Sequence, residues 1–254
     1  MQTTLEILTH PLLSGTRHGF FTRKGGASSG LFAGLNCGRR STDQSDMVLV
    51  NRTRVADAMG VDAGHLATVR QVHSADVVTI GAEADLDALR DTDADGLVTA
   101  RRDVALAVLT ADCQPILLAD PEAGVVGACH AGWRGALNGV IEGTVAAMQA
   151  LGATQIRAVI GPSISQRAYE VGPEFMDDFL TEDPESDRFF SGGPQGRPMF
   201  DLPAFGLSRL RAAGVEAEWS RHCTYSDPER FFSYRRATHE GQADYGRLIS
   251  AISL

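Results

Sequence analysis

The chain of 254 residues has few cysteines and no long apolar run. Its four cysteines are spread along the sequence without a Cys-x-x-Cys pair: Cys37, Cys113, Cys129 and Cys223. This spacing excludes a dense disulfide framework and indicates reduced thiols in the cytoplasm. No window reaches 18 uninterrupted apolar residues, and residues 1–10 do not join a basic region to a long apolar stretch. We therefore expect neither secretion nor a membrane span.

Positive charge is in deficit, because 23 lysines and arginines stand against 32 aspartates and glutamates, a formal net charge of −9. Nucleic acids and anionic membranes repel such a chain, so we expect it to bind neither. An anionic substrate would need a local basic site. The sequence shows no repeat, low-complexity tract or long polar linker, which predicts a single domain over residues 1–254. We expect this domain to be a monomer.

Short apolar segments rich in β-branched residues predict many strands. The predicted strands are residues 68–72, 77–80, 104–109, 116–119, 125–129, 157–160 and 215–219. Helices are predicted over residues 45–59, 140–151 and 203–213, each followed by a glycine. Because strands occur both in hairpins and across helices, we predict an α+β fold of layered mixed β-sheets flanked by helices. Residues 184–198 are expected to form a mobile surface loop.

Three residues with metal-binding side chains fall where predicted strands enter loops: His73, Cys113 and His130. A thiolate and two imidazoles suit zinc, and three protein ligands with a free fourth position are typical of catalytic sites. The separations of 40 and 17 residues match no compact zinc motif, so packed side chains remain an alternative. Cys113 and His130 can also form a thiolate–imidazolium nucleophile pair. Neighbours in a strand point to opposite faces, so we assign His130 to the site and Cys129 to the core.

Several basic or turn-forming segments can hold an anion or line a pocket. Arg23 and Lys24 precede a glycine-rich turn that lacks the P-loop signature. Arg134 lies just ahead of a helix, where the backbone adds positive potential, although it can also simply stack on Trp133. Ser163 follows a predicted strand in Ile-Gly-Pro-Ser-Ile and can form a corner of the pocket.

An acidic run over residues 91–96 matches the opening of a calcium loop, Asp-x-Asp-x-Asp-Gly. The twelfth position of that loop would be Arg102, where calcium requires a bidentate glutamate. We therefore interpret the run as an acidic turn before a strand.

An ordered series of motifs closely resembles the YfiH-type family, known as polyphenol oxidase (laccase domain), purine nucleoside phosphorylase and peptidoglycan editing factor. The motifs are TRKGG (22–26), LNCG (35–38), QVH (71–73), ADGLVT (94–99), TADC (110–113), HAGWRG (130–135), IGPSI (160–164), YEVG (169–172), CTY (223–225) and FSYRR (232–236). The resemblance covers nearly the whole chain. It implies a mixed α/β domain that holds a metal, usually zinc, at His73, Cys113 and His130.

The same resemblance implies an activity on purine nucleosides. Family members phosphorolyse adenosine, inosine, guanosine and S-methyl-5′-thioadenosine to a base and a sugar 1-phosphate, and they deaminate adenosine to inosine. An alternative is a peptidoglycan-precursor amidase that releases L-serine from UDP-MurNAc-L-Ser, with Cys113 as the nucleophile. A copper-dependent polyphenol oxidase is disfavoured, because multicopper centres need roughly ten histidines, typically in His-x-His pairs. This chain has seven histidines and no such pair, so copper is expected only as an adventitious metal in vitro.

Within the nucleoside hypothesis, the remaining motif residues receive roles. Arg134, with the loop of Arg23 and Lys24, is expected to hold phosphate. Asp112 can orient a ligand or move a proton, or it can cap its turn. Asn36 and Gln71 are expected to contact the substrate. The resemblance breaks near the C-terminus, where Asp-Tyr-Gly-Arg (244–247) replaces the usual Thr-Gly-Arg, so a contact made by that threonine is in doubt.

Overall fold

The computed structural model describes residues 4–254. Its strands are β1 (Ile7–Leu8), β2 (Arg17–Phe21), β3 (Leu66–Ala67), β4 (Val77–Ile80), β5 (Gly96–Thr99), β6 (Ala105–Thr110), β7 (Gln114–Asp120), β8 (Val125–Ala131), β9 (Arg157–Ile160), β10 (Phe190–Gly192), β11 (Pro198–Phe200), β12 (Glu216–Trp219) and β13 (Leu248–Ser253). Its α-helices are α1 (Ser45–Met59), α2 (Trp133–Asn138), α3 (Val140–Ala150), α4 (Pro173–Glu182), α5 (Leu202–Ala212) and α6 (Tyr234–His239). No helix within residues 4–254 has both the length and the apolar character to cross a membrane.

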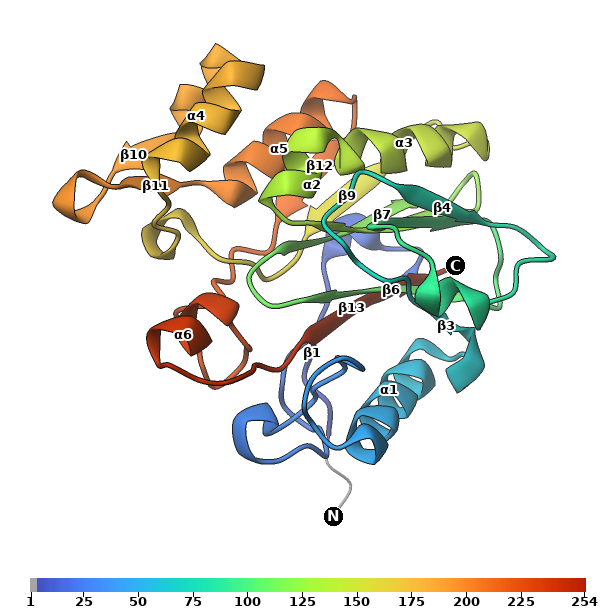
Figure 1. Ribbon diagram of the computed structural model, residues 1–254. Helices are drawn as coiled ribbons and strands as arrows, with labels where there is room; N and C mark the ends of the chain where they lie inside the picture. Colours follow the sequence, from blue (N-terminus) through green and yellow to red (C-terminus); the bar gives the residue numbers. More distant parts are fainter. Residues whose placement is uncertain (1–3) are drawn as a thin grey trace.

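Two large sheets form the body of the molecule (Figure 1). The five-stranded sheet has the order β1-β2-β13-β6-β3, and the six-stranded sheet has the order β12-β9-β7-β8-β5-β4. Most neighbours are antiparallel, but β3 pairs with β6, β4 with β5, and β12 with β9 in parallel. Both sheets are therefore mixed, and the predicted α+β class is confirmed.

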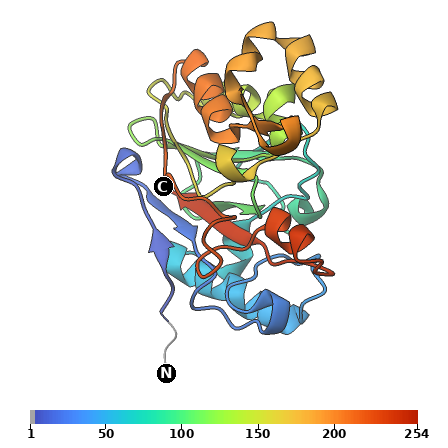
Figure 2. The same ribbon diagram turned by 90° about the vertical axis from the view of Figure 1, so that its left-hand side faces the viewer.

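The sheets pack face to face, and helices cover their outer faces (Figures 1 and 2). In β6, Leu106 and Val108 lie in the core between the sheets, whereas Ala105 and Ala107 face the core under α1. In β7, Leu117 likewise faces the other sheet, while the residues beside it pack under the helices α3 and α5. Because both faces of the central strands are buried, their sequences are continuous apolar runs rather than alternating ones. The result is a four-layer arrangement of helices, sheet, sheet and helix.

The three predicted helices are present within one or two residues of their expected bounds. Helix α1 ends at Gly60, which adopts a left-handed conformation with φ of 69°. At its start, Gln44 occupies the N-cap position without a side-chain hydrogen bond. Asp201 caps α5 by accepting a hydrogen bond from the backbone N–H of Ala204. Local end signals were therefore sufficient to place these helices.

Two of the segments predicted from the sequence take another form in the structure. The expected strand at residues 68–72 does not form, since β3 ends at Ala67, an isolated bridge joins Arg70 to Asp93, and the next contact is made by the side chain of Gln71. Its amide donates to the Leu109 carbonyl and accepts from the Leu109 N–H, both at 2.7 Å. Residues 184–198 are not an irregular loop. They contain 3₁₀ turns, strand β10 and the first residue of β11, and the two strands pair as an antiparallel hairpin. Phe190 and Phe200 of this hairpin pack on Phe179 of α4.

Candidate metal centre and its two cavities

Three side chains with metal-binding atoms meet at one end of the two sheets. His73 follows β3, Cys113 lies in the turn between β6 and β7, and His130 is near the end of β8. Their ligand atoms all lie within 4.8 Å of one another, and Cys113 Sγ is 3.8 Å from His73 Nε2. The two imidazole rings meet edge to face with centroids 4.7 Å apart. The structure thus brings together the three residues singled out in the sequence, and their donor atoms fit a metal ion.

The backbone around this cluster adopts uncommon conformations. His73 has φ of 62° and Asp112 has φ of 84°, the left-handed region that few non-glycine residues occupy. Gly132 lies directly beneath the cluster, where a Cβ atom would sit 2.7 Å from His73 Cδ2 and 3.0 Å from Cys113 Sγ. The close approach of the three ligand residues therefore requires glycine at position 132.

Asp95, which the sequence analysis assigned to an acidic turn, supports two of the three ligand residues. One carboxylate oxygen lies 2.7 Å from His130 Nδ1, and the other accepts hydrogen bonds from the backbone N–H groups of Val72 and Ser74 at 3.1 and 2.6 Å. The first contact fixes the His130 ring with Nε2 left for a metal, and the second holds the turn that carries His73. Burial raises the pKa of Asp95, but these hydrogen bonds outweigh it and lower the pKa overall.

The electrostatics of the cluster favour a thiolate. Burial alone would raise the pKa of Cys113, but His130 and His73 outweigh it and lower the pKa to about 6. Burial also opposes a charged His130, yet the Cys113 sulfur and Asp95 raise its pKa to about 9. A thiolate is the form of cysteine that binds metals or attacks carbonyl groups. The arrangement therefore suits a metal ligand or a nucleophile, the two alternatives that the sequence left open.

Asp112, adjacent to Cys113, is buried and contacts the C-terminal part of the chain. Thr224 Oγ1 donates to one carboxylate oxygen at 2.5 Å, and Ser233 Oγ and the Arg235 N–H donate to the other at 2.9 and 2.7 Å. Burial raises the pKa of Asp112 against the opposing effect of these hydrogen bonds. In this structure Asp112 joins the Cys113 turn to the start of α6 and to the segment before it.

One side of the cluster opens into a cavity of about 300 Å³, here called the arginine cavity. Six arginines line it: Arg39, Arg40, Arg52, Arg70, Arg90 and Arg247. No carboxylate of the described residues lines it. Four of the arginines are paired with aspartates outside the lining, Arg40 with Asp91, Arg70 with Asp93, Arg90 with Asp87 and Arg247 with Asp244. Arg39 and Arg52 have no such partner among the described residues, so this part of an acidic chain keeps positive charge, which is what an anionic ligand requires.

The other side of the cluster opens into a cavity of about 600 Å³, here called the aromatic cavity. Four aromatic side chains contribute to its lining: Trp133, Tyr169, Phe175 and Tyr234. His73, Ala111 and Cys113 line both cavities. The metal-type cluster therefore lies at the junction of a cationic space and an aromatic space.

Of the two predicted polar contacts to substrate, one lines a cavity and one does not. Gln71 lines the arginine cavity, although its amide is engaged with Leu109. Asn36 is fully buried, and its amide binds Ser41 and Asp43 and accepts from the N–H groups of Gly38 and Arg247. Its side chain organises the loop that follows.

The residues expected to hold an anion lie outside both cavities. The Arg23 guanidinium donates to the carbonyls of Ala33 and Pro228 and lies over the Phe232 ring at 4.3 Å. Arg134 is exposed within the short helix α2 and stacks on the Trp133 ring at 4.8 Å, the alternative considered for it above. Ser163 is buried, and its hydroxyl has no hydrogen-bond partner among the described residues.

The other cysteines lie away from the cluster. Cys129 is buried in the core under the helices, which confirms that it faces away from His130. Cys223 is half-buried and accepts hydrogen bonds from the hydroxyls of Ser165 and Ser226.

The sequence reasoning missed Asp95 and the arginine cavity. Asp95 belongs to the Asp-x-Asp-x-Asp-Gly run, whose density of acids was the available signal. The six arginines come from five separate segments, so only the fold brings them together.

Comparison with known proteins gives consistent results. Residues 17–254 match a family model described as multi-copper polyphenol oxidoreductase laccase. The chain is 40% identical over 258 residues to a purine nucleoside phosphorylase of Deinococcus radiodurans, covering 98% of this chain and 93% of that protein. It is 39% identical over 241 residues to purine nucleoside phosphorylase ORF3 of Streptomyces griseus, covering 92% and 94% respectively.

Solved structures share the whole fold. Protein NMB0706 of Neisseria meningitidis has a TM-score of 0.85 at 35% identity, with 98% of each chain covered. YfiH of Bacillus licheniformis has a TM-score of 0.84 at 31% identity, covering 93% of this chain and 92% of that one. The family match, the relatives and these structures agree with the motifs read from the sequence, and the chain belongs to the YfiH-type family of laccase-domain proteins.

Proposed function

We propose that this protein is a zinc-dependent purine nucleoside phosphorylase that also deaminates adenosine to inosine. The proposed substrates are adenosine, inosine, guanosine and S-methyl-5′-thioadenosine, together with phosphate. Relatives about 40% identical carry the name purine nucleoside phosphorylase, which supports the reaction class.

The observation that carries the proposal is the position of the cluster of His73, Cys113 and His130 between the two cavities. A purine is a flat aromatic ring system, and the aromatic side chains in the lining of the aromatic cavity, Trp133 and Phe175 among them, suit contact with it. Phosphate is a small multivalent anion, and guanidinium groups match its oxygens in pairs. A ribose that joins a base on one side to an attacking phosphate on the other would lie at the junction.

Phosphorolysis at this junction requires one bond to form and one to break. A phosphate oxygen attacks C1′ of the ribose, the bond from C1′ to the purine nitrogen breaks, and the products are the free base and a sugar 1-phosphate. The chain's contribution is to hold the two reactants in line and to supply positive charge to the phosphate.

Zinc, held by His73, Cys113 and His130, would supply an activated water for the deamination of adenosine when the purine, rather than the ribose, lies against the cluster. The residues fit this metal because two imidazoles and a thiolate are preferred zinc donors, and the chain provides three ligands rather than the four of a structural site. Asp95 keeps the His130 ring in the orientation that leaves Nε2 free.

Two other activities are weaker candidates. An amidase that releases L-serine from a peptidoglycan precursor is favoured by one observation, the Cys113 sulfur within 4.8 Å of imidazole nitrogens of His130 and His73. A copper-dependent polyphenol oxidase is disfavoured because residues 4–254 hold one three-ligand cluster, whereas a multicopper oxidase needs several metal centres.

The test is a product assay on metal-analysed protein with adenosine, in the presence and absence of phosphate. We expect adenine and ribose 1-phosphate only with phosphate, and inosine in both conditions. Cys113→Ala should lose both activities, whereas Cys223→Ala, which removes a half-buried thiol outside the cluster, should keep both. A fully zinc-loaded wild type that forms neither product would refute the proposal, and release of serine from the muramoyl precursor would then support the amidase.

A further inference from the structure

The most unusual charge in the arginine cavity belongs to Arg52 of α1. Arg52 is only 4% exposed, and its guanidinium forms no hydrogen bond or ion pair with a carboxylate of the described residues. The guanidinium donates to Thr68 Oγ1 at 3.0 Å and, at 3.4 Å, to the Cys37 carbonyl. A buried charge without a counter-ion costs free energy, so it is normally paired. Arg52 lines the cavity, and an anion bound there would be its partner.

Arg247, on the wall of the same cavity, is held in place by its neighbours in sequence. Its Nη1 atom donates to Asp244 at 2.9 Å and to the Tyr245 carbonyl at 2.6 Å, and the guanidinium lies 4.0 Å from the centroid of the Tyr245 ring. No hydrogen bond from Nε or Nη2 to another of residues 4–254 is present, so these donors are available to a ligand.

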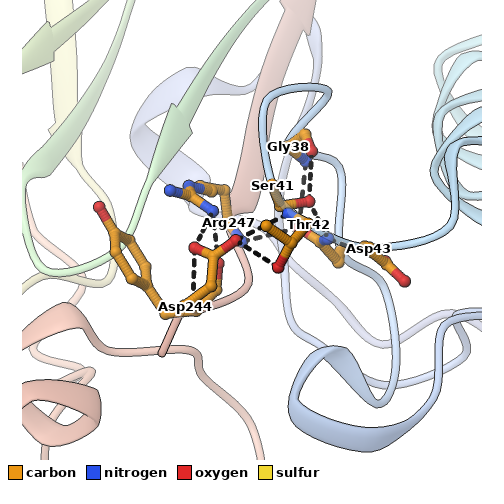
Figure 3. Close-up of polar contacts among 8 residues, drawn as sticks. Gly38, Ser41, Thr42, Asp43, Asp244 and Arg247 are labelled. Atoms are coloured by element: carbon orange, nitrogen blue, oxygen red, sulfur yellow. Dashed lines mark hydrogen bonds and ion pairs between the residues drawn. The ribbon is translucent and has the colours of Figure 1, made fainter. Parts of the chain in front are cut away.

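Asp244 also binds the loop that carries two further arginines of the cavity. Figure 3 shows Asp244 between Arg247 and Thr42, and its second carboxylate oxygen accepts from the Thr42 N–H at 2.7 Å and from Thr42 Oγ1 at 3.1 Å. We call these contacts of Asp244 with Thr42 and Arg247 the Asp244 clasp. The clasp fixes the loop from Gly38 to Asp43, and hence Arg39 and Arg40, against Arg247.

Packing reinforces the clasp. A Cβ atom at Gly38 would lie 2.6 Å from Cδ of Arg247, so the glycine allows the aliphatic part of the arginine to rest on the loop backbone. The Arg247 carbonyl accepts from the Cys37 N–H at 3.0 Å, and the Arg247 N–H donates to Asn36 at 2.9 Å. The segments around residues 40 and 245, far apart in sequence, therefore form one wall of the cavity.

The clasp includes residues 244–247, Asp-Tyr-Gly-Arg, where the usual motif is Thr-Gly-Arg. Tyr245 occupies the place of the threonine, lines the cavity and covers Arg247, while Asp244 precedes it. The position of the Arg247 guanidinium in this protein thus depends on side chains that the motif alone does not specify.

We propose that the arginine cavity is a phosphate-binding site in which Arg52 and Arg247 contact the anion and Asp244 acts as a positioning residue. The proposal rests on the proposed function for its second substrate, and it assigns that substrate to residues other than Arg23 and Arg134. Orthophosphate and the phosphoryl group of a sugar 1-phosphate share the same chemistry, so one site would take both.

Direct binding tests the site without catalysis. Inorganic phosphate should raise the melting temperature of the zinc-loaded wild type, because a ligand that binds only the folded state stabilises it. Sodium chloride of the same ionic strength is the control for screening. Arg52→Met should abolish the phosphate effect, while its melting temperature without phosphate should equal or exceed that of the wild type, because an unpaired buried charge is removed. Arg209→Gln, which breaks an ion pair with Glu142 outside the cavity, should respond as the wild type does.

Kinetics test the positioning role. In phosphorolysis of inosine, Asp244→Ala should raise the KM for phosphate about threefold to tenfold, as the loss of one or two hydrogen bonds predicts, with little change in kcat. Asp244→Asn keeps one acceptor and should give an intermediate KM. The KM for inosine should not change. A purely structural role would instead lower kcat and the melting temperature together and leave the KM for phosphate unaltered.

The outcomes separate the two proposals. If the wild type phosphorolyses inosine but the Arg52 and Asp244 variants keep the wild-type KM for phosphate and the wild-type thermal response, the phosphate site is refuted and the proposed function stands. If phosphate stabilises the wild type through Arg52 but no nucleoside is cleaved, the proposed function is wrong and the phosphate site stands.

Discussion

Replacing Asp95 by asparagine tests whether the carboxylate behind His130 controls the metal site. The side chains have nearly the same shape, but an amide has one acceptor atom where the carboxylate has two. Asp95 receives hydrogen bonds on both sides, from His130 on one and from Val72 and Ser74 on the other. Asp95→Asn can therefore satisfy only one side.

The structure predicts which side is lost. If the amide oxygen faces Val72 and Ser74, it keeps three hydrogen bonds, and the NH₂ group faces His130 Nδ1. The imidazole must then carry its hydrogen on Nε2, the atom needed by the metal. Loss of such a supporting carboxylate typically weakens metal binding by about 10- to 100-fold, which is about 1.4 to 2.7 kcal/mol. The opposite orientation leaves the partly buried N–H groups of Val72 and Ser74 without their acceptor, which costs folding free energy of at most about 1 to 3 kcal/mol each.

The assay is a competition titration of metal-free protein with zinc and a chromophoric chelator, accompanied by a thermal melt. Asp103→Asn is the matched control, because Asp103 is an exposed carboxylate that pairs with Arg101 outside both cavities. The control should bind zinc as the wild type does. If folded Asp95→Asn binds zinc within about threefold of the wild type and melts at the same temperature, Asp95 neither orients His130 nor supports the His73 turn.

Three further predictions concern the cluster and the aromatic cavity. Iodoacetamide should modify Cys113 only after a chelator removes the metal, whereas Cys223 should react with or without the metal, as measured by peptide mass spectrometry. Prompt modification of Cys113 in the metal-loaded protein would favour the amidase. Gly132→Ala should lower zinc affinity at least tenfold, because its Cβ would meet two ligand residues. Gly81→Ala has open space around its Cβ and should leave zinc affinity unchanged; the same zinc titration measures both variants. Phe175→Leu keeps apolar volume but removes an aromatic ring, so the KM for inosine should rise about fivefold while the KM for phosphate stays unchanged. Equal changes in both KM values would contradict the assignment of the base to the aromatic cavity and of phosphate to the arginine cavity.

The sequence was informative where the signal is local. Gly60 marks the end of α1, and the apolar runs of β6, β7 and β8 reveal strands buried on both faces. Cys113 and His130 were found because each lies at the end of such a run, whereas His73 follows an expected strand of which the structure forms only the neighbouring β3. Strand β13 was missed because Leu248–Ser253 interleaves serines with apolar residues, a pattern without the expected β-branched bias.

The remaining parts of the site depend on contacts between distant segments. Each cavity arginine, taken alone, resembles an ordinary solvated residue, and only the pairing of β13 with β6 brings Arg247 beside the chain around Arg70. Gln71 was expected to contact substrate, yet its amide is engaged with Leu109 in the place of a strand pair. Neither fact follows from periodicity or composition, because both arise from tertiary packing.

The Cys113 turn has a consequence for the cohesion of the whole molecule. β6 belongs to the five-stranded sheet and β7 to the six-stranded sheet, so Cys113 lies where the chain crosses from one to the other. His73 follows a strand of the first sheet, and His130 belongs to the second. An ion held by all three would act as a cross-link between the two sheets, and separating them would first require its release. Metal loading would therefore slow amide hydrogen exchange deep in both sheets, far beyond the three ligand residues.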